Sequence, residues 1–353
     1  MTGPETHLLN MRSRWGNVSR MISCMAVNRL SSYLLLIAGL LTFCSPLVAQ
    51  NSTTGSVLIE NDLVSGDPYK TERFYVDSAM ELSIFTLSGD VEVYENPAID
   101  YIQIDLYVDR GFSFWGGGAN LDNYRIIFQK TRRQIIASVE PKRNESKVWE
   151  GENVSFSYIV QTPVDISSRI RNTRGDIYAR NLKGDHLMQA TVGNLYVENI
   201  EGEINAYSAS GNINAERVRG NLNAKTTNGK IIVLDSDGEM RLRSVTGHIE
   251  ANGGRGTFIA ATTTGNVEAD LLSVGEGSYV ETVTGNIDMI LPGQLNYSLE
   301  ASGSTVDISD LLNSGDFEGN VQKQVANVVF GSGSIPVQLS SVTGKVTVKT
   351  SSN

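Results

Sequence analysis

Beyond about residue 170 the chain alternates between apolar and polar positions in short runs, and a glycine separates each run from the next. In one run Ile213 and Ala215 are apolar, while Asn212 and Asn214 beside them are polar. A period of two is typical of β-strands, because successive side chains point to opposite faces of a sheet. The pattern therefore predicts short strands, each with one face in a core and the other in solvent.

The glycines between these runs recur at a fixed spacing. Six of them lie 18 residues apart, and three more continue the series less regularly: Gly175, Gly193, Gly211, Gly229, Gly247 and Gly265, then Gly285, Gly303 and Gly344. A second series lies nine residues after the first: Gly184, Gly202, Gly220, Gly238 and Gly256. Each 18-residue unit therefore predicts two strands and two turns. We refer to the first series as the anchor glycines.

One such unit cannot bury its apolar side alone, so the units are expected to stack. We predict an all-β fold: a single elongated, two-faced parallel β-solenoid with an 18-residue repeat, two short strands per rung, and irregular β caps at both ends. Small residues three positions before the anchor glycines are expected to form a ladder inside the corner: Ala190, Ser208, Thr226, Ser244, Thr262 and Thr282. The run His186-Leu187-Met188 departs from the phase by one residue, which predicts a β-bulge.

The flanking sequence is less regular and suggests four segments. We expect a signal peptide in residues 1–50, an N-terminal β cap with the first strands in 51–165, the regular solenoid in 166–309, and a C-terminal cap with the last repeat in 310–353. Val91 and Val93 repeat the strand pattern once within the N-terminal segment.

The first 50 residues have the composition of a leader. Four arginines precede an apolar run at residues 33–43, and Leu47-Val48-Ala49-Gln50 follows it. The run is shorter than the ~20 residues that span a bilayer, and the order of basic flank, apolar core and small residue is typical of a signal peptide. We therefore expect export to the periplasm, the outer membrane or the exterior, with no transmembrane helix afterwards. Both cysteines, Cys24 and Cys44, lie in the leader, so the exported chain should contain no disulfide.

The repeated phrase Ser/Thr-x-x-Gly-Asp/Asn-Ile/Val-x-Ala/Val resembles that of a known family. It appears, with variations, at Thr191–Val197, Thr282–Ile287 and Ser341–Val346. This iterated motif is similar to the bacterial putative-adhesin family of β-strand-repeat proteins, the domain of unknown function 4097, over roughly residues 80 to 350. The resemblance implies a β-solenoid-like fold and an exported or envelope-facing location. It supplies no catalytic residues to transfer.

The sequence contains no recognisable catalytic motif. His186 and His248, the two histidines after the leader, fall in different half-repeats and different rungs. Asp235–Gly238 resembles a calcium loop faintly, but it lacks the remaining ligands and falls on a corner turn. We therefore expect no catalytic residue, no metal site and no cofactor. A carbohydrate-active β-helix enzyme is the alternative, although the repeats between residues 175 and 265 have almost no insertions to build a groove.

Exposed aromatic residues are the candidates for partner binding. Tyr178 and Tyr196 hold the same outward position in consecutive rungs, Tyr207 lies on the second face, and Trp115 adjoins three glycines. Exposed aromatic rings can dock sugars or proteins, but Tyr178 and Tyr196 would fit equally well as a cross-strand pair that only stabilises the sheet.

Composition narrows the class of partner. A net charge of −10 argues against nucleic acid. We expect a non-enzymatic, adhesin-like binding or scaffold protein with an unknown protein or glycan partner on the envelope. An envelope-stress regulatory or sensing module is the second hypothesis. The ends of a solenoid also present open strands, so end-to-end self-association is a further expectation.

Overall fold

The chain divides into two compact units, Met1–Glu60 and Asn61–Asn353. The computed structural model describes residues 66–76, 80–111, 120–142, 154–163, 165–293 and 296–351, all within the second unit. The predicted signal peptide, both cysteines and Trp115 lie outside the described residues.

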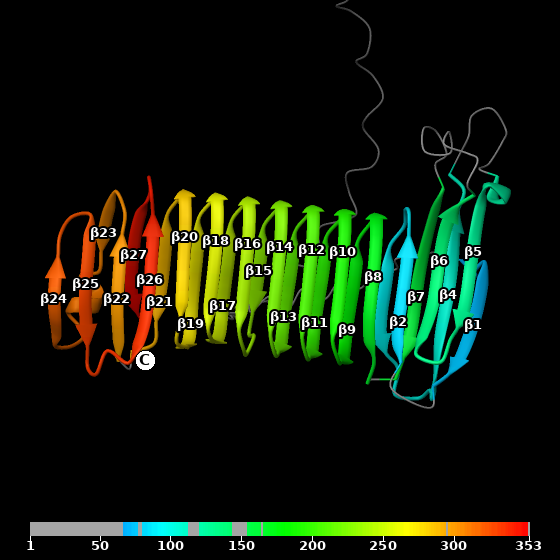
Figure 1. Ribbon diagram of the computed structural model, residues 1–353, viewed down its shortest axis with the longest axis horizontal. Coiled ribbons are helices and arrows are strands. Elements are labelled where there is room, and N and C mark those ends of the chain that lie inside the picture. Colours follow the sequence, from blue (N-terminus) through cyan, green and yellow to red (C-terminus); the bar gives the residue numbers. More distant parts are fainter. Residues whose placement is uncertain are drawn as a thin grey trace, which may run out of the picture. The chain divides into compact units, whose positions relative to one another are not determined.

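Within the second unit the strands form two sheets (Figure 1). Sheet A contains, in spatial order, β1 (Lys70–Tyr75), β4 (Tyr101–Asp109), β7 (Ser155–Thr162), β3 (Val91–Glu95), β9 (Ile177–Lys183), β11 (Leu195–Glu201), β13 (Ile213–Arg219), β15 (Ile231–Leu234), β17 (Ile249–Gly256), β19 (Val267–Val274), β21 (Ile287–Leu291), β27 (Lys345–Thr350) and β23 (Thr305–Asp307). Sheet B contains, in the opposite chain sense, β24 (Phe317–Val321), β25 (Val325–Phe330), β22 (Tyr297–Ser302), β26 (Ile335–Ser341), β20 (Ser278–Thr284), β18 (Phe258–Thr264), β16 (Met240–Thr246), β14 (Leu222–Asn228), β12 (Ile204–Ser210), β10 (His186–Val192), β8 (Ser167–Arg174), β2 (Glu81–Thr86), β6 (Gln134–Pro141) and β5 (Tyr124–Lys130). A 3-10 turn at Leu121–Asn123 and the short helix α1 (Ser309–Leu312) complete the described elements.

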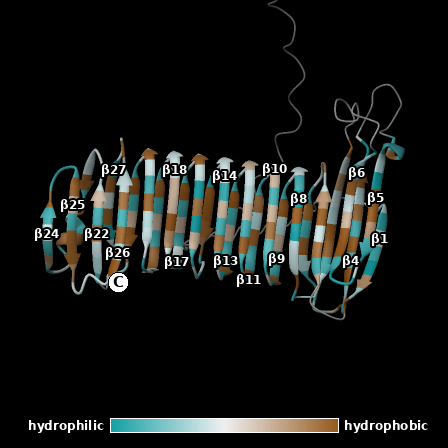
Figure 2. Cartoon of the chain, viewed as in Figure 1, coloured by the Kyte–Doolittle hydropathy of each residue, from teal (hydrophilic) through white to brown (hydrophobic). Residues whose placement is uncertain are grey.

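From β8 to β21 the chain passes back and forth between the two sheets, one strand in each per repeat. Neighbouring strands pair in parallel, as Leu195 does with Ile213 in sheet A and Ile204 with Leu222 in sheet B, each 18 residues apart. These apolar residues are fully buried between the sheets. Figure 2 shows the resulting alternation of apolar and polar bands along the strands. The predicted two-faced parallel β-solenoid is therefore confirmed.

The anchor glycines mark corners where consecutive rungs touch. Gly193 has φ +155°, and a Cβ atom there would lie 1.9 Å from the carbonyl oxygen of Gly175. No side chain fits in that space, because real Cβ atoms do not approach an oxygen so closely. The 18-residue spacing of the glycines thus records the contact of one corner with the next.

The small residues three positions before the anchor glycines form the predicted ladder inside the corner. The Ser208 hydroxyl donates a hydrogen bond to the carbonyl oxygen of Gly193 (2.8 Å), and the Thr226 hydroxyl donates one to that of Gly211 (2.9 Å). Ser244, Thr262, Thr282 and Ser341 repeat this bond with Gly229, Gly247, Gly265 and Gly285. At these six positions a side-chain bond therefore joins neighbouring rungs in addition to strand pairing, whereas Ala190 has no hydroxyl to donate.

The β-bulge expected at His186-Leu187-Met188 is wrong. His186 pairs with Ile204 and Met188 with Ala206 without any register shift. His186 and Met188 face the core, whereas Leu187 faces outward. The apparent change of phase arose because a polar residue occupies the core position and an apolar one lies outside. The register irregularity in this part of the sheets lies instead between Asn252 and Arg255 in β17.

The last repeat does not occupy the end of the stack. β26 lies between β20 and β22, and β27 lies between β21 and β23. Gly344 consequently stacks on Gly285, the place expected for Gly303, and Gly303 stacks on Gly344. The last anchor glycines therefore do not stack in chain order, because β26 and β27 lie between strands that precede them in the sequence.

The first rung, formed by β2 and β3, is likewise inserted out of chain order. β2 lies between β8 and β6, and β3 lies between β9 and β7, so an early segment lies between two later ones. Beyond these inserted rungs the pairing becomes antiparallel, as between β4 and β7, β5 and β6, β22 and β25, and β24 and β25. Both ends of the described stack thus contain a rung inserted out of chain order and then antiparallel strands.

Candidate binding surface on the outer face of sheet A

The outer face of sheet A carries side chains in regular rows. The third residue after each anchor glycine forms one row, which runs Tyr178, Tyr196, Asn214, Ile232, Glu250, Glu268 and Asp288. Neighbours in a row come from paired strands and are therefore about 4.8 Å apart. A ligand lying along the row would contact one side chain from each rung.

Tyr178 and Tyr196 meet as predicted for consecutive rungs. Their rings stack with centroids 4.7 Å apart and planes 4° apart. Tyr178 is only 7% exposed, while Tyr196 is half-buried, so Tyr196 is the ring with surface left for a partner. Burial, assisted by the charges of Asp176 and Asp90, raises the pKa of Tyr196, and the phenol stays neutral at physiological pH.

An ion pair with a buried carboxylate lies beside the stacked rings. Glu92 of β3 is 7% exposed and pairs with the Arg180 guanidinium of β9. Burial raises the pKa of Glu92, and Arg180 partly opposes this by stabilising the carboxylate. The pair sets the position of Arg180, whose strand is paired with that of Tyr196.

Carboxylates occupy the same row four rungs further along. Glu250, Glu268 and Asp288 are neighbours in register. They line a hollow of about 520 Å³ together with residues of β17, β19, β21 and β27: Ala251, Asn252, Ala269, Asp270, Met289, Ile290, Thr347 and Lys349. Like charges in adjacent strand positions oppose folding, so this arrangement lowers stability relative to neutral side chains.

Tyr207 lies on the outer face of sheet B, away from the stacked pair. Its hydroxyl donates to Asn205 Oδ1 (3.2 Å) and accepts a hydrogen bond from Asn223 Nδ2 (2.8 Å). Exposed cations lie on the same face: Arg169, Arg171, Lys225, Arg241 and Arg243. The structure therefore brings Tyr178 and Tyr196 together, separates Tyr207 from them, and does not describe Trp115.

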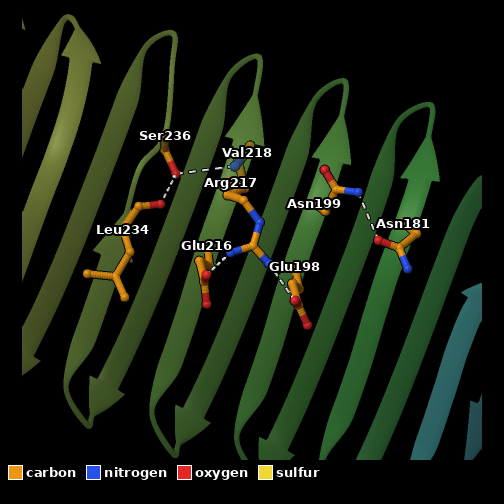
Figure 3. A network of polar contacts seen from close by, with 8 residues as sticks. All are labelled: Asn181, Glu198, Asn199, Glu216, Arg217, Val218, Leu234 and Ser236. Atoms are coloured by element: carbon orange, nitrogen blue, oxygen red, sulfur yellow. Dashed lines mark hydrogen bonds and ion pairs between the residues drawn. The ribbon is translucent and has the colours of Figure 1, made fainter. Parts of the chain in front are cut away.

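Sequence reasoning missed a row of left-handed residues at the end of these strands. Asn181, Asn199, Arg217 and Asp235 have φ between 47° and 56°, and each lies six residues after an anchor glycine. Figure 3 shows Asn199 donating from Nδ2 to Asn181 Oδ1 (2.8 Å) and Arg217 reaching Glu198 and Glu216. Asn and Asp tolerate this conformation best after glycine, so their presence at three of these four positions, 18 residues apart except at Arg217, was the available signal.

The two histidines differ in environment. His186 is buried, with Nδ1 2.8 Å from the Ser168 hydroxyl oxygen, and burial lowers its pKa to about 4. His248 is exposed, and its Nδ1 accepts a hydrogen bond from the backbone N–H of Asn266 (3.0 Å). In the described part of the chain, no three His, Cys, Asp or Glu side chains are grouped to hold a metal ion.

A protein-family model matches the later repeats and the C-terminal strands of the chain. Residues 193–349 match the family model Toastrack DUF4097. This part of the chain is similar to Toastrack domains. The match confirms the family resemblance expected from the repeated phrase, and it runs from the second anchor glycine almost to the end of β27. The Toastrack family is a domain of unknown function and assigns no activity.

Two solved structures are also similar to this chain. A putative cell adhesion protein from Clostridium sporogenes is 11% identical, with 81% of this chain and 100% of that chain covered and a TM-score of 0.22. A putative lipid binding protein from Parabacteroides distasonis is 13% identical, with 80% and 98% covered and a TM-score of 0.42. Sequence identities and TM-scores this low support no conclusion about the function of this chain. No curated protein matches the chain.

The described residues also bear on membrane insertion. None of their helices combines the length and the apolar character that crossing a bilayer requires.

Proposed function

We propose that this protein is an exported, envelope-associated binding or scaffold protein without catalytic activity, adhesin-like in its action, and that it binds its partner on the outer face of sheet A. The observation that carries the proposal is the in-register row of outward side chains on that face, from Tyr178 to Asp288. A row of this kind offers repeated, equally spaced contacts to an extended partner such as a glycan or a polypeptide.

The arrangement of the carboxylates favours binding over hydrolysis. Enzymes that cleave glycosidic bonds place two carboxyl groups on opposite sides of the scissile bond. Glu250, Glu268 and Asp288 instead project side by side from adjacent strands of one sheet face. They are suited to contacting successive units of a ligand that lies across the strands.

Binding to arrayed envelope glycans and envelope proteins tests this proposal. We expect Tyr196→Ala to weaken the binding of any partner that the wild-type protein captures, because Tyr196 keeps exposed ring surface in the row. Tyr207→Ala is the matched control, since it removes a half-buried tyrosine from the opposite face. Equal loss in both variants, or loss only in Tyr207→Ala, would refute a site on sheet A.

The exported location has its own test. Fractionation of the host cell should recover the protein in the envelope or the medium, with its N-terminus beyond residue 48 when the leader has been removed. Recovery in the cytoplasm with an intact N-terminus would contradict the proposed location.

A further inference from the structure

The described sheets end in four edge strands, and three of them are protected against pairing with another chain. β1 carries Lys70, Glu72 and Arg73, and β5 carries Arg125 and Lys130. Charged side chains, and lysine above all, discourage edge pairing. β23 is only three residues long, and very short edge strands offer little to pair with.

The fourth edge strand, β24, is five residues long, with one charged residue, Glu318, and no lysine or arginine, so it is the least protected of the four. Its sequence is Phe317-Glu318-Gly319-Asn320-Val321, and all five residues are exposed. Phe317 and Val321 are opposite Phe330 and Ala326 of β25, which are fully buried, so they extend the core-facing side of sheet B. They nevertheless remain 41% and 39% exposed. The core-facing side of this sheet therefore ends in two apolar side chains that no described residue covers fully.

Backbone geometry shows which groups of β24 point outward. The N–H of Gln322 donates to the carbonyl oxygen of Val325 (2.8 Å), so this pair is of the hydrogen-bonded kind. Hydrogen-bonded and non-hydrogen-bonded pairs alternate along an antiparallel ladder. Glu318 and Asn320 therefore bond to β25, whereas the N–H and C=O groups of Phe317, Gly319 and Val321 point away from it.

The outward-pointing residues are self-complementary about Gly319. We propose that β24 pairs antiparallel with β24 of a second copy of this chain, on a two-fold axis at Gly319. In that register Phe317 is opposite Val321 of the second copy, Gly319 is opposite its equivalent, and Glu318 is opposite Asn320. The only charged residue of the strand thus meets a neutral amide rather than another carboxylate. A two-fold contact requires this reciprocity, since residue i meets j wherever j meets i.

This pairing joins sheet B of both copies into one sheet and keeps both core-facing sides on the same face. It also buries Phe317 and Val321 against each other across the axis. One pair of short strands is a small interface compared with the roughly 1,000 Å² or more of stable complexes. The dimer is therefore expected to dissociate on dilution. The proposal does not depend on the partner proposed for sheet A.

Sedimentation velocity on the full chain over a range of concentrations tests the dimer. We expect a monomer–dimer equilibrium that Val321→Lys weakens at least about tenfold, since it places a charge opposite Phe317 of the second copy. Val329→Lys is the matched control, because Val329 is 38% exposed but lies one strand inside the edge and on the outer face. A monomer at all concentrations, species that grow beyond a dimer, or equal loss in both variants would overturn the proposal.

Cross-linking tests the register even if Val321→Lys affects folding. Residues 318 and 320 of the two copies would form a non-hydrogen-bonded pair, whose Cα separation of about 4.5 Å permits a disulfide. In a Cys24→Ser/Cys44→Ser background, Glu318→Cys/Asn320→Cys should oxidise to a covalent dimer, whereas Glu318→Cys alone should not. Failure of the double variant to cross-link, or equal cross-linking of the single variant, would refute the two-fold axis at Gly319.

Discussion

His186 lies beside Ile204 in sheet B, in the core position that apolar residues hold in the following rungs. Its Nδ1 contacts the Ser168 hydroxyl, but in either tautomer Nε2 is left without a hydrogen-bonding partner among the described residues. A polar ring that is 1% exposed and half satisfied lowers stability relative to an apolar side chain of similar size.

The first prediction is that acid destabilises the fold through His186. Its pKa falls from 6.5 to about 4 on folding because burial disfavours the imidazolium. The unfolded chain therefore binds a proton at His186 more tightly than the folded chain does. Protonation of His186 costs no stability above pH 6.5, and the free energy of unfolding decreases as the pH falls from 6.5 towards 4. This decrease in the free energy of unfolding should reach about 3 kcal/mol. Denaturant melts between pH 7 and 4 should show that His186→Leu/Ser168→Ala loses less stability than the wild type, and a parallel decline would contradict this assignment.

The second prediction concerns a buried hydroxyl. Tyr158 is fully buried, and no described residue forms a hydrogen bond with its hydroxyl oxygen. Tyr158→Phe should raise the free energy of unfolding by about 1 kcal/mol, because an unsatisfied polar atom is removed. Tyr297→Phe is the control, since the Tyr297 hydroxyl donates to the carbonyl oxygen of Pro292 (3.4 Å). Thermal melts should separate the two variants; greater stabilisation in Tyr297→Phe would contradict the argument.

The third prediction concerns the left-handed row. Arg217 has φ +53°, a conformation that costs a long side chain more than asparagine. Arg217→Asn should stabilise the fold by about 1 kcal/mol, less the small contribution of its exposed ion pairs with Glu198 and Glu216. Arg219→Asn, the same change at an exposed position outside the left-handed row, should leave the unfolding midpoint unchanged. Destabilisation by Arg217→Asn would show that the ion pairs contribute more than the strain.

The fourth prediction separates corner contact from backbone conformation. Gly211→Ala should destabilise the fold by about 3 kcal/mol or more, because the added Cβ would lie 2.0 Å from the carbonyl oxygen of Gly193. Gly277→Ala should cost only about 1–2 kcal/mol, since Gly277 also has positive φ but meets no atom within 4 Å. Equal losses in denaturant melts would mean that conformation alone explains the anchor glycines.

The rungs were predictable because their signals are local. The spacing of Gly193 and Gly211, and the Ser208 and Thr226 hydroxyls before them, follow from contacts between one repeat and the next. The tyrosine pair was predictable for the same reason, since Tyr178 and Tyr196 are one repeat apart.

The remaining features depend on contacts between distant parts of the chain or on exceptions to the pattern. Nothing in the phrase around Gly344 specifies that it stacks on Gly285 rather than on Gly303, because all three belong to similar repeats. His186 was misplaced because a core histidine looks like an outward residue in the alternation of polar and apolar positions. The acidic hollow gathers Glu250, Glu268 and Asp288 from rows that sequence alone could identify, but its depth depends on the packing of four strands.

The inserted rung has a mechanical consequence for the C-terminus. β27 is hydrogen-bonded to β21 on one side and to β23 on the other, so the end of the described chain is not an edge. A force applied near residue 351 must first separate Val348–Thr350 from β21, and then Val346 and Thr347 from β21 and β23 at once. β27 should therefore resist removal more strongly at Val346 and Thr347, where two parallel strands hold it, than at its last three residues.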